Sequence, residues 1–259
     1  MDLGLKGKRA LVSGSTAGIG FAIAKLLARE GAFVYVNGRT EARVNKAVGE
    51  IEGKVDGVAA DLSTEEGAAA LFSRVGHLDI VVNNLGIFET RPFLEIDDAD
   101  WRRFFEVNVL SGVRITRHYL PHMLEKKWGR VVFISSESGV QIPAEMVHYG
   151  MTKTAQLAVA RGIAESFPDS GITVNSVLVG PTESEGVDTF VENFARQEGK
   201  TKEQFAREFF QNARPSSLIK RFETPEEVAA MVVFLCSEAA SATTGSAVRV
   251  DGGVVRAIL

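Results

Sequence analysis

A tyrosine and a lysine stand four residues apart in the stretch YGMTK, as Tyr149 and Lys153. The residues on both sides have a helical pattern, and positions i and i+4 lie on one face of a helix, within reach of each other. A phenol beside an ammonium group can exchange protons more readily, because the positive charge favours the phenolate. The same spacing also occurs in surface pairs without a chemical role, so the elements that position the two side chains decide between these interpretations.

The composition is that of a globular protein with a large hydrophobic core. The chain has 259 residues, 45% of them hydrophobic and 24% charged, which suits one large domain. Its net charge is −4 and it has no long basic run, so we expect neither nucleic acid nor a membrane as a partner. No apolar run is long enough to span a bilayer, and the first residues lack a signal-peptide pattern. Cys236 is the single cysteine and cannot pair within the chain, which favours a reducing, cytoplasmic location.

Short β-rich segments alternate with longer amphipathic segments along most of the chain. This alternation predicts parallel βαβ units, and the continuously apolar strands predict that helices cover both faces of the sheet. We therefore expect an α/β fold of the Rossmann type, doubly wound, with a seven-stranded, mostly parallel sheet in one domain over 1–259. The expected strands are 9–13, 33–37, 54–60, 79–84, 130–135, 172–179 and 247–251, and the expected helices between them are 18–30, 41–52, 64–75, 98–125 and 150–167.

One segment, 183–213, interrupts this alternation directly after the sixth strand. It holds two amphipathic runs on either side of Gly199 and Lys200. Segments in such places often cover the neighbouring site, so we expect a helical substrate lid here, with a fixed pair of surface helices as the alternative.

A glycine-rich turn, SGSTAGIG, follows the first strand and opens the next helix. Glycine lets the backbone turn tightly and approach a pyrophosphate at the helix N-terminus. Because the turn stands after the first strand of a βαβ unit, it predicts dinucleotide binding. The candidate cofactor-binding residues of this turn are Gly14, Ser15, Thr16, Gly18, Ile19 and Gly20.

The end of the second strand bears on the choice of dinucleotide. NAD-binding folds often place an acidic residue there for the ribose 2′-hydroxyl, but this chain has Asn37 and Gly38, followed by Arg39. A carboxylate would repel a 2′-phosphate, whereas an arginine can hold one with two hydrogen bonds. We therefore expect NADP(H) to be preferred, with NAD(H) possible; the alternative for Arg39 is a solvated loop side chain.

Polar or glycine-rich residues also follow the third, fourth and sixth strands, and serines follow the fifth. Ligands of open parallel sheets bind beyond the C-terminal ends of the strands, and the helix that carries Tyr149 and Lys153 starts at this edge. The pair is therefore expected to face the cofactor crevice. Further cofactor-binding candidates at the edge are Asp61, Leu62, Asn83, Leu85, Gly86, Gly180, Thr182 and Ser184.

Together these motifs resemble the single-domain type of the short-chain dehydrogenase/reductase family, whose members are often named 3-oxoacyl-[acyl-carrier-protein] reductase. The resemblance covers almost the whole chain and implies an oxidoreductase that interconverts a ketone or aldehyde and an alcohol, assembled as a homotetramer. The motifs are SGSTAGIG, NNLG, VNVLSG with Asn108, ISSESG with Ser136, YGMTK, NSVLVGPTES and TGSAVRVDGG. The family places a serine 13 residues before the tyrosine, which indicates Ser136, with Ser135 and Ser138 as alternatives.

The resemblance also implies a role for each catalytic candidate. Tyr149 would act as general acid while the cofactor supplies a hydride, and Ser136 would hold the substrate oxygen. Lys153 would lower the pKa of the phenol and bind the ribose of the nicotinamide. Asn108, in a locally distorted helix, would hold a water that links Lys153 to solvent.

Two positions depart from the family pattern. Leu85 replaces the alanine of NNAG, and Val179 with Gly180 replaces the proline and glycine after the sixth strand. The hydroxyl that meets the carboxamide of the cofactor is then Ser184 or Thr182.

Other functions remain as alternatives. A 3-oxoacyl thioester reductase would need basic residues for an acidic carrier protein, and the chain offers Lys127 but then Asp169. A dinucleotide-sensing protein without turnover would typically lack the tyrosine or the lysine, enoyl reductases space the two more widely, and sugar-nucleotide epimerases are longer. His118 and His122 have a spacing that zinc sites use, but no third ligand is evident, so we expect no metal.

Overall fold

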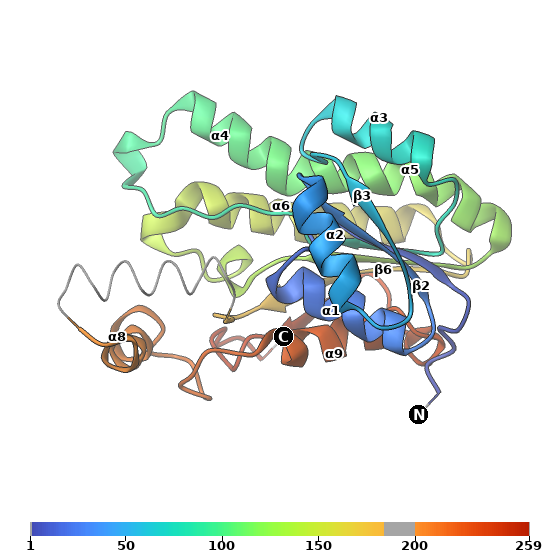
Figure 1. Ribbon diagram of the computed structural model, residues 1–259. Helices are drawn as coiled ribbons and strands as arrows, with labels where there is room; N and C mark the ends of the chain where they lie inside the picture. The colour runs from blue at the N-terminus through green and yellow to red at the C-terminus, as the bar shows by residue number, and fades with distance from the viewer. Residues whose placement is uncertain (1, 184–199, 259) are drawn as a thin grey trace.

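The computed structural model describes residues 2–183 and 200–258 of the chain (Figure 1). Most of the predicted lid over 183–213, namely 184–199, lies outside the described residues. None of the helices in the described part of the chain combines the length and the apolar character needed to cross a lipid bilayer.

The seven strands form one wholly parallel sheet, which confirms the predicted α/β, doubly wound architecture. The strand order is β3-β2-β1-β4-β5-β6-β7, so the chain reverses its winding direction between β1 and β4. In such sheets ligands bind outside the C-terminal strand ends near this reversal. The strands are β1 (Arg9–Val12), β2 (Phe33–Gly38), β3 (Lys54–Ala59), β4 (Ile80–Asn83), β5 (Gly129–Ile134), β6 (Ile172–Val179) and β7 (Ala247–Val250).

Alternate residues of β1, β2, β4, β5 and β6 enter two different hydrophobic clusters, one on each face of the sheet. In β1, for example, Ala10 and Val12 join one cluster and Leu11 joins the other, because successive side chains of a strand point to opposite faces. Both clusters are buried, which explains the continuously apolar strands seen in the sequence.

Helices cover both faces. Helices α1 and α9 contribute to the first cluster, and α3, α5 and α6 contribute to the second. The α-helices are α1 (Gly18–Arg29), α2 (Glu41–Glu50), α3 (Glu65–Arg74), α4 (Asp98–Phe105), α5 (Ser111–Lys126), α6 (Val147–Ser166), α8 (Lys202–Glu208) and α9 (Pro225–Leu235). The short helical turns are η1 (Phe93–Glu95), η2 (Glu106–Leu110), η3 (Glu137–Gly139), η4 (Ala144–Met146), η5 (Phe209–Ala213) and η6 (Glu238–Ala240).

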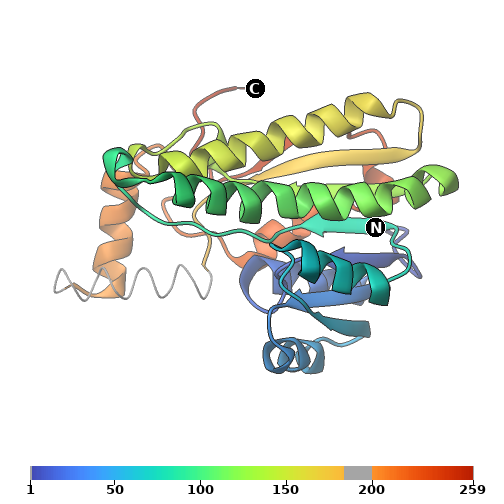
Figure 2. The same ribbon diagram turned by 90° about the horizontal axis from the view of Figure 1, so that it is seen from above.

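The helix that was expected over 98–125 contains a distortion. Between α4 and α5 the chain makes one π-helical turn, η2, and Asn108 lies in its middle. Helix α6 runs alongside this long element, as Figure 2 shows, and contacts both α4 and η2. The wider turn thus occurs where α6 packs against this long element, and single π-helical turns frequently mark functional sites.

Candidate active site

The glycine-rich turn after β1 has the close packing that a dinucleotide cradle needs. Gly14 and Gly18 have φ angles of 61° and 56°, a region that favours glycine. A Cβ atom on Gly20 would lie 2.5 Å from the carbonyl oxygen of Gly14 and 2.5 Å from Nδ2 of Asn84. The turn can therefore keep this shape only with glycine at these positions, and the N-terminus of α1 lies directly behind it.

Hydrogen bonds fasten this turn to the end of β2. The Ser15 hydroxyl donates to the carbonyl oxygen of Val12 at 2.6 Å and accepts from the N–H of Asn37 at 2.9 Å. The Asn37 side chain accepts from the N–H of Gly14 at 3.1 Å and donates to the carbonyl oxygens of Val58 and Ala60. Asn37 is therefore a buried structural residue that joins β2, β3 and the turn, and it is occupied within the fold.

The end of β2 carries no carboxylate at the position where a NAD-binding fold often places one for the ribose 2′-hydroxyl. A Cβ atom on Gly38 would lie 2.5 Å from the methyl group of Thr16, so an acidic side chain at this position would displace the turn. Arg39 is exposed beside it. Arg43 and Lys46 of α2 line a second cavity that also includes Thr16.

The other candidates at the strand ends, Asp61, Leu62, Asn83 and Leu85, are all occupied by contacts within the fold. The Asp61 carboxylate accepts from the N–H and the hydroxyl of Ser63, while Leu62 is buried in the second cluster. The Asn83 side chain donates to the Thr116 hydroxyl on α5 at 2.9 Å and so turns away from the crevice. Leu85 packs against the second cluster, so its bulk does not enter the pocket described next.

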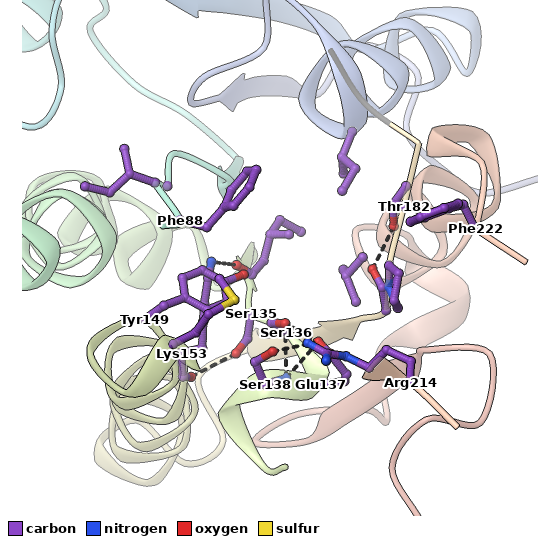
Figure 3. A pocket seen from close by; sticks show the side chains of 18 of the residues that line it. Phe88, Ser135, Ser136, Glu137, Ser138, Tyr149, Lys153, Thr182, Arg214 and Phe222 are labelled. Carbon is purple, nitrogen blue, oxygen red and sulfur yellow. Dashed lines mark hydrogen bonds and ion pairs between the residues drawn. The ribbon is translucent and has the colours of Figure 1, made fainter. Parts of the chain in front are cut away.

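A pocket of about 280 Å³ opens at the C-terminal strand ends (Figure 3). It brings together Ser136, Tyr149 and Lys153, three of the four catalytic candidates. Gly86, Gly180, Thr182 and Ile19, which were expected at the cofactor, also line it, and Ser184 lies outside the described residues. The remaining lining residues that concern the argument below are Asn84, Phe88, Glu137, Ser138, Glu145, Phe209, Arg214 and Phe222.

Lys153 and Tyr149 occupy the first turns of α6, at the floor and wall of this pocket. The Lys153 Nζ atom donates to the carbonyl oxygen of Ile134 at 2.9 Å and lies 5.5 Å from the centre of the Tyr149 ring. Burial lowers the pKa of Lys153 to about 8. Burial raises the pKa of Tyr149 above its ordinary value; hydrogen bonding with Ser136 and the charge of Arg214 act to lower it, and the Glu137 carboxylate acts to raise it.

Ser136 lies two residues beyond the end of β5 and is the N-cap of the short turn η3. Its hydroxyl donates to Oε2 of Glu137 and accepts from the N–H of Ser138 at 3.1 Å. Ser135, one of its alternatives, is occupied elsewhere, because its hydroxyl donates to the carbonyl oxygen of Lys153 at 2.8 Å. All three serines line the pocket, and Ser136 is the one that acts to lower the pKa of Tyr149.

Asn108 lies behind the pocket and joins three elements. Its Nδ2 atom donates to the carbonyl oxygen of Ile87 and to the hydroxyl of Thr152, both at 3.0 Å, and its Oδ1 atom accepts from the N–H of Ile87 at 2.8 Å. A Cβ atom on Gly86 would lie 3.4 Å from Nζ of Lys153 and 3.5 Å from Oδ1 of Asn108. Both polar atoms therefore border the same small gap, which glycine keeps open.

Comparison with known proteins decides the family. The family model described as "Enoyl-(Acyl carrier protein) reductase" matches residues 14–255. A Bacillus subtilis protein described as uncharacterized oxidoreductase YvrD is 48% identical over 263 residues, covering 100% of both chains. The 3-oxoacyl-[acyl-carrier-protein] reductase FabG of Aquifex aeolicus is 34% identical over 262 residues, covering 98% of this chain and 100% of the relative. The protein belongs to the short-chain dehydrogenase/reductase family.

A solved structure of this kind agrees closely with the fold. L-sorbose reductase from Gluconobacter frateurii, complexed with NADPH and L-sorbose, superimposes with a TM-score of 0.93 at 31% identity, covering 100% of both chains. This short-chain dehydrogenase/reductase is an NAD(P)(H)-dependent oxidoreductase that interconverts carbonyl compounds and alcohols.

The described residues fit a nicotinamide dinucleotide. The glycine turn supplies backbone N–H groups beside the N-terminus of α1, and Gly86 keeps a side chain away from the Nζ atom of Lys153. A Cβ atom on Gly180 would lie 2.4 Å from Oε1 of Glu223, so glycine is needed there as well. In the described part of the chain no group of three or more His, Cys, Asp or Glu side chains could hold a metal ion.

Several pocket residues were not among the candidate site residues from the sequence, and Asn84, Arg214 and Phe222 illustrate why. Asn84 donates from Nδ2 to the carbonyl oxygens of Ser13 and Gly14, and it neighbours Asn83, whose side chain turns away. Arg214 and Phe222 come from the chain that follows η5, and no motif marks them. Only the position of Asn84 within NNLG could have signalled its place, whereas the other two reach the pocket through tertiary packing.

Proposed function

We propose that this enzyme reduces a ketone or aldehyde to an alcohol, and catalyses the reverse oxidation, with NADP(H) as the preferred dinucleotide. The observation that carries the proposal is the placement of Ser136, Tyr149 and Lys153 in one pocket, at the strand edge that also holds the glycine turn. This placement puts a proton donor, a hydrogen-bond donor and a cation next to a site that suits a nicotinamide.

The proposed chemistry divides the work among these side chains. The nicotinamide, when bound, supplies the hydride that a carbonyl carbon receives. Tyr149 gives its proton to the carbonyl oxygen as negative charge grows there, and Ser136 donates a hydrogen bond to the same oxygen. Lys153 stabilises the phenolate that Tyr149 becomes, since its Nζ atom lies 5.5 Å from the ring centre.

Asn108 is proposed to serve the return of the proton. Oδ1 of Asn108 and Nζ of Lys153 border the gap beside Gly86, so a polar route can pass from Lys153 towards the η2 turn. The hydrogen bonds from Asn108 to Ile87 and Thr152 keep that turn in its widened form. In this role Asn108 is a positioning residue, because it acts through Lys153.

The preference for NADP(H) is supported by the residues around the end of β2. Arg39 is exposed there, Gly38 carries no carboxylate, and Lys46 lies in the adjoining cavity beside Thr16. A guanidinium can bind a 2′-phosphate with two hydrogen bonds. The NADPH bound to the related L-sorbose reductase also supports this preference.

A second candidate function is the reduction of 3-oxoacyl thioesters, which the relation to the Aquifex aeolicus reductase favours. The test for both is a screen in which purified protein, with NADPH or NADH, receives ketones, aldehydes, keto sugars, 3-oxoacyl thioesters and enoyl thioesters. We expect oxidation of NADPH with a carbonyl compound. Turnover of enoyl thioesters alone would replace the proposal with enoyl reduction, and dinucleotide binding without any turnover would indicate a sensing protein.

We also propose a homotetramer and a cytoplasmic location. Ile258 near the C-terminus is 92% exposed, whereas Val254 and Val255 are buried within the protomer, so in the described part of the tail Ile258 is the side chain that could make an apolar contact with another subunit. The free, buried Cys236 suits a reducing compartment. Light scattering at micromolar concentration should report a tetrameric mass, and a monomeric mass would contradict the assembly.

A further inference from the structure

A buried ion pair lies in the pocket and has no part in the chemistry proposed so far. The Glu137 carboxylate accepts from Nε of Arg214 at 2.8 Å, and the two side chains are only 5% and 12% exposed. They come from distant parts of the chain, the turn after β5 and the segment after η5. Figure 3 shows Arg214 reaching towards Glu137 beside Ser136 and Ser138.

The hydrogen bonds of Glu137 are almost fully used. Its Oε2 atom accepts from the Ser136 hydroxyl, from the Ser138 N–H at 2.8 Å and from the Ser138 hydroxyl at 3.1 Å. Its Oε1 atom accepts from Arg214. A serine hydroxyl has a single hydrogen, so Ser136 cannot donate to Glu137 and to a substrate carbonyl at the same time.

Substrate binding must therefore exchange one hydrogen bond for another. When Ser136 turns its hydrogen to a carbonyl oxygen, the Glu137 carboxylate loses a donor inside a buried site. Leaving a buried charged acceptor short of a partner is costly, and hydrogen bonds to charged groups are stronger than neutral ones. A plain ketone would replace a bond to a carboxylate with a weaker one, and Oε2 of Glu137 would keep only its two bonds from Ser138, while Arg214 still balances the charge.

A hydroxyl group on the carbon next to the carbonyl removes this cost. Such a substrate carries an acceptor for Ser136 and, one carbon away, a donor for the place that Ser136 leaves on Glu137. A carboxyl group at the same position would bring a second negative charge against Glu137, and Arg214 already compensates the charge of Glu137. The pair is therefore suited to a hydroxyl and not to an anion.

We propose that the substrate is a carbonyl compound with a hydroxyl group on the adjacent carbon, and that Glu137, held by Arg214, is the residue that binds this hydroxyl. The corresponding alcohol is a vicinal diol. The proposal rests on the function proposed above, because it assigns a substrate class to the same pocket. Three observations support the proposal. Ser136 donates a hydrogen bond to Glu137, Arg214 donates another to Glu137, and all three residues line the pocket.

Three small substrates of matched shape test it. Hydroxyacetone, butan-2-one and pyruvate share an acetyl group and differ in carrying a hydroxymethyl, an ethyl or a carboxylate group on the other side. With wild-type enzyme and NADPH, kcat/KM for hydroxyacetone should exceed that for butan-2-one by about tenfold or more, which is the range for a hydrogen bond to a charged group. Pyruvate should be the poorest of the three.

The variant Glu137→Gln should bring the ratio of hydroxyacetone to butan-2-one close to one. Because the Arg214 guanidinium is a donor, the glutamine would turn its amide oxygen towards Arg214. Its NH₂ group would then face Ser136, where the hydroxyl of the substrate needs an acceptor and would meet a donor instead. Binding of NADPH, followed by its fluorescence, shows that the variant is folded. Glu145→Gln is the matched control, because it removes an exposed carboxylate from the same pocket and should leave the ratio unchanged.

The outcomes separate this proposal from the one on which it rests. Equal kcat/KM for hydroxyacetone and butan-2-one in the wild type, or a ratio that survives in Glu137→Gln, would overturn the role of Glu137 while ketone reduction stands. A preference for pyruvate would overturn it in favour of an anion site at Arg214. Failure to reduce any carbonyl compound, here or in the wider screen, would overturn both.

Discussion

The ammonium group of Lys153 donates a hydrogen bond to the carbonyl oxygen of Ile134, the last residue of β5, at 2.9 Å. This bond ties the first turns of α6 to the end of β5. It holds the lysine side chain under the Tyr149 ring, where burial lowers the lysine pKa to about 8. The spacing of Tyr149 and Lys153 thus has a structural consequence, because both side chains are placed at the crevice by one short segment.

Replacing Tyr149 and replacing Lys153 should have different effects. Tyr149→Phe removes one hydroxyl, so we expect turnover to fall by a factor of about 10² to 10⁴ while NADPH binding is nearly unchanged. Lys153→Met removes the cation at the nicotinamide side and should reduce both turnover and NADPH affinity. Steady-state rates and fluorescence titration of the dinucleotide measure the two effects. A Tyr149→Phe enzyme that keeps more than about a hundredth of the activity would remove the tyrosine from its role as general acid.

The choice of dinucleotide should depend on Arg39. Arg39→Ala should weaken NADPH binding selectively and leave NADH binding unchanged, because only NADPH carries the 2′-phosphate. Titration of both dinucleotides against wild type and variant gives the four dissociation constants. Arg29→Ala, at the far end of α1, is a matched control that removes a positive charge elsewhere. Equal wild-type affinities for the two dinucleotides would contradict the preference.

Asn108 should stabilise the fold as well as support turnover. Asn108→Ala leaves the N–H and carbonyl groups of Ile87 without their partner, and the loss of a partner by a buried polar group costs about 1–3 kcal/mol. Denaturant unfolding should therefore show a decrease of this size in the free energy of unfolding. Thr152→Ser, which keeps the hydroxyl that Asn108 contacts, is the control. An unchanged midpoint in Asn108→Ala would show that these hydrogen bonds contribute little.

Glu223 should make the stability depend on pH. It is 3% exposed, and burial, together with the nearby charge of Asp251, raises its pKa to about 8 from an ordinary value of 4.5. Between these two values the native state binds more protons than the unfolded chain, so the free energy of unfolding falls as pH rises, by at most about 1.4 kcal/mol per pH unit. Glu223→Gln, which resembles the protonated acid, should flatten this dependence. If the free energy of unfolding changed with pH in the same way for wild type and variant between pH 5 and pH 8, ionisation of Glu223 would not affect stability.

Local sequence patterns predicted the strand edge at which the site lies and most of the catalytic residues in the pocket. The apolar strands and the turns after them place the glycine turn, Ser136, Tyr149 and Lys153 at one edge, since the C-terminal ends of parallel strands all lie on the same side of the sheet. The π-helical turn around Asn108 could be expected only through the family resemblance. Its width depends on the hydrogen bonds with Ile87 and Thr152, which stand far from Asn108 in the sequence.

By itself the sequence determined the α/β architecture, the order of the elements and the spacing of the proton-transferring side chains, because periodicity and turn chemistry act over a few residues. Only the tertiary structure decided that Asn83 turns to α5 while Asn84 holds the glycine turn, and that Arg214 pairs with Glu137 beside Ser136. The Glu137 carboxylate and the Arg214 guanidinium belong to segments 77 positions apart in the chain. Their pairing depends on how those segments pack against each other, and on the need of a buried charge for a partner of the opposite sign, which no local pattern expresses.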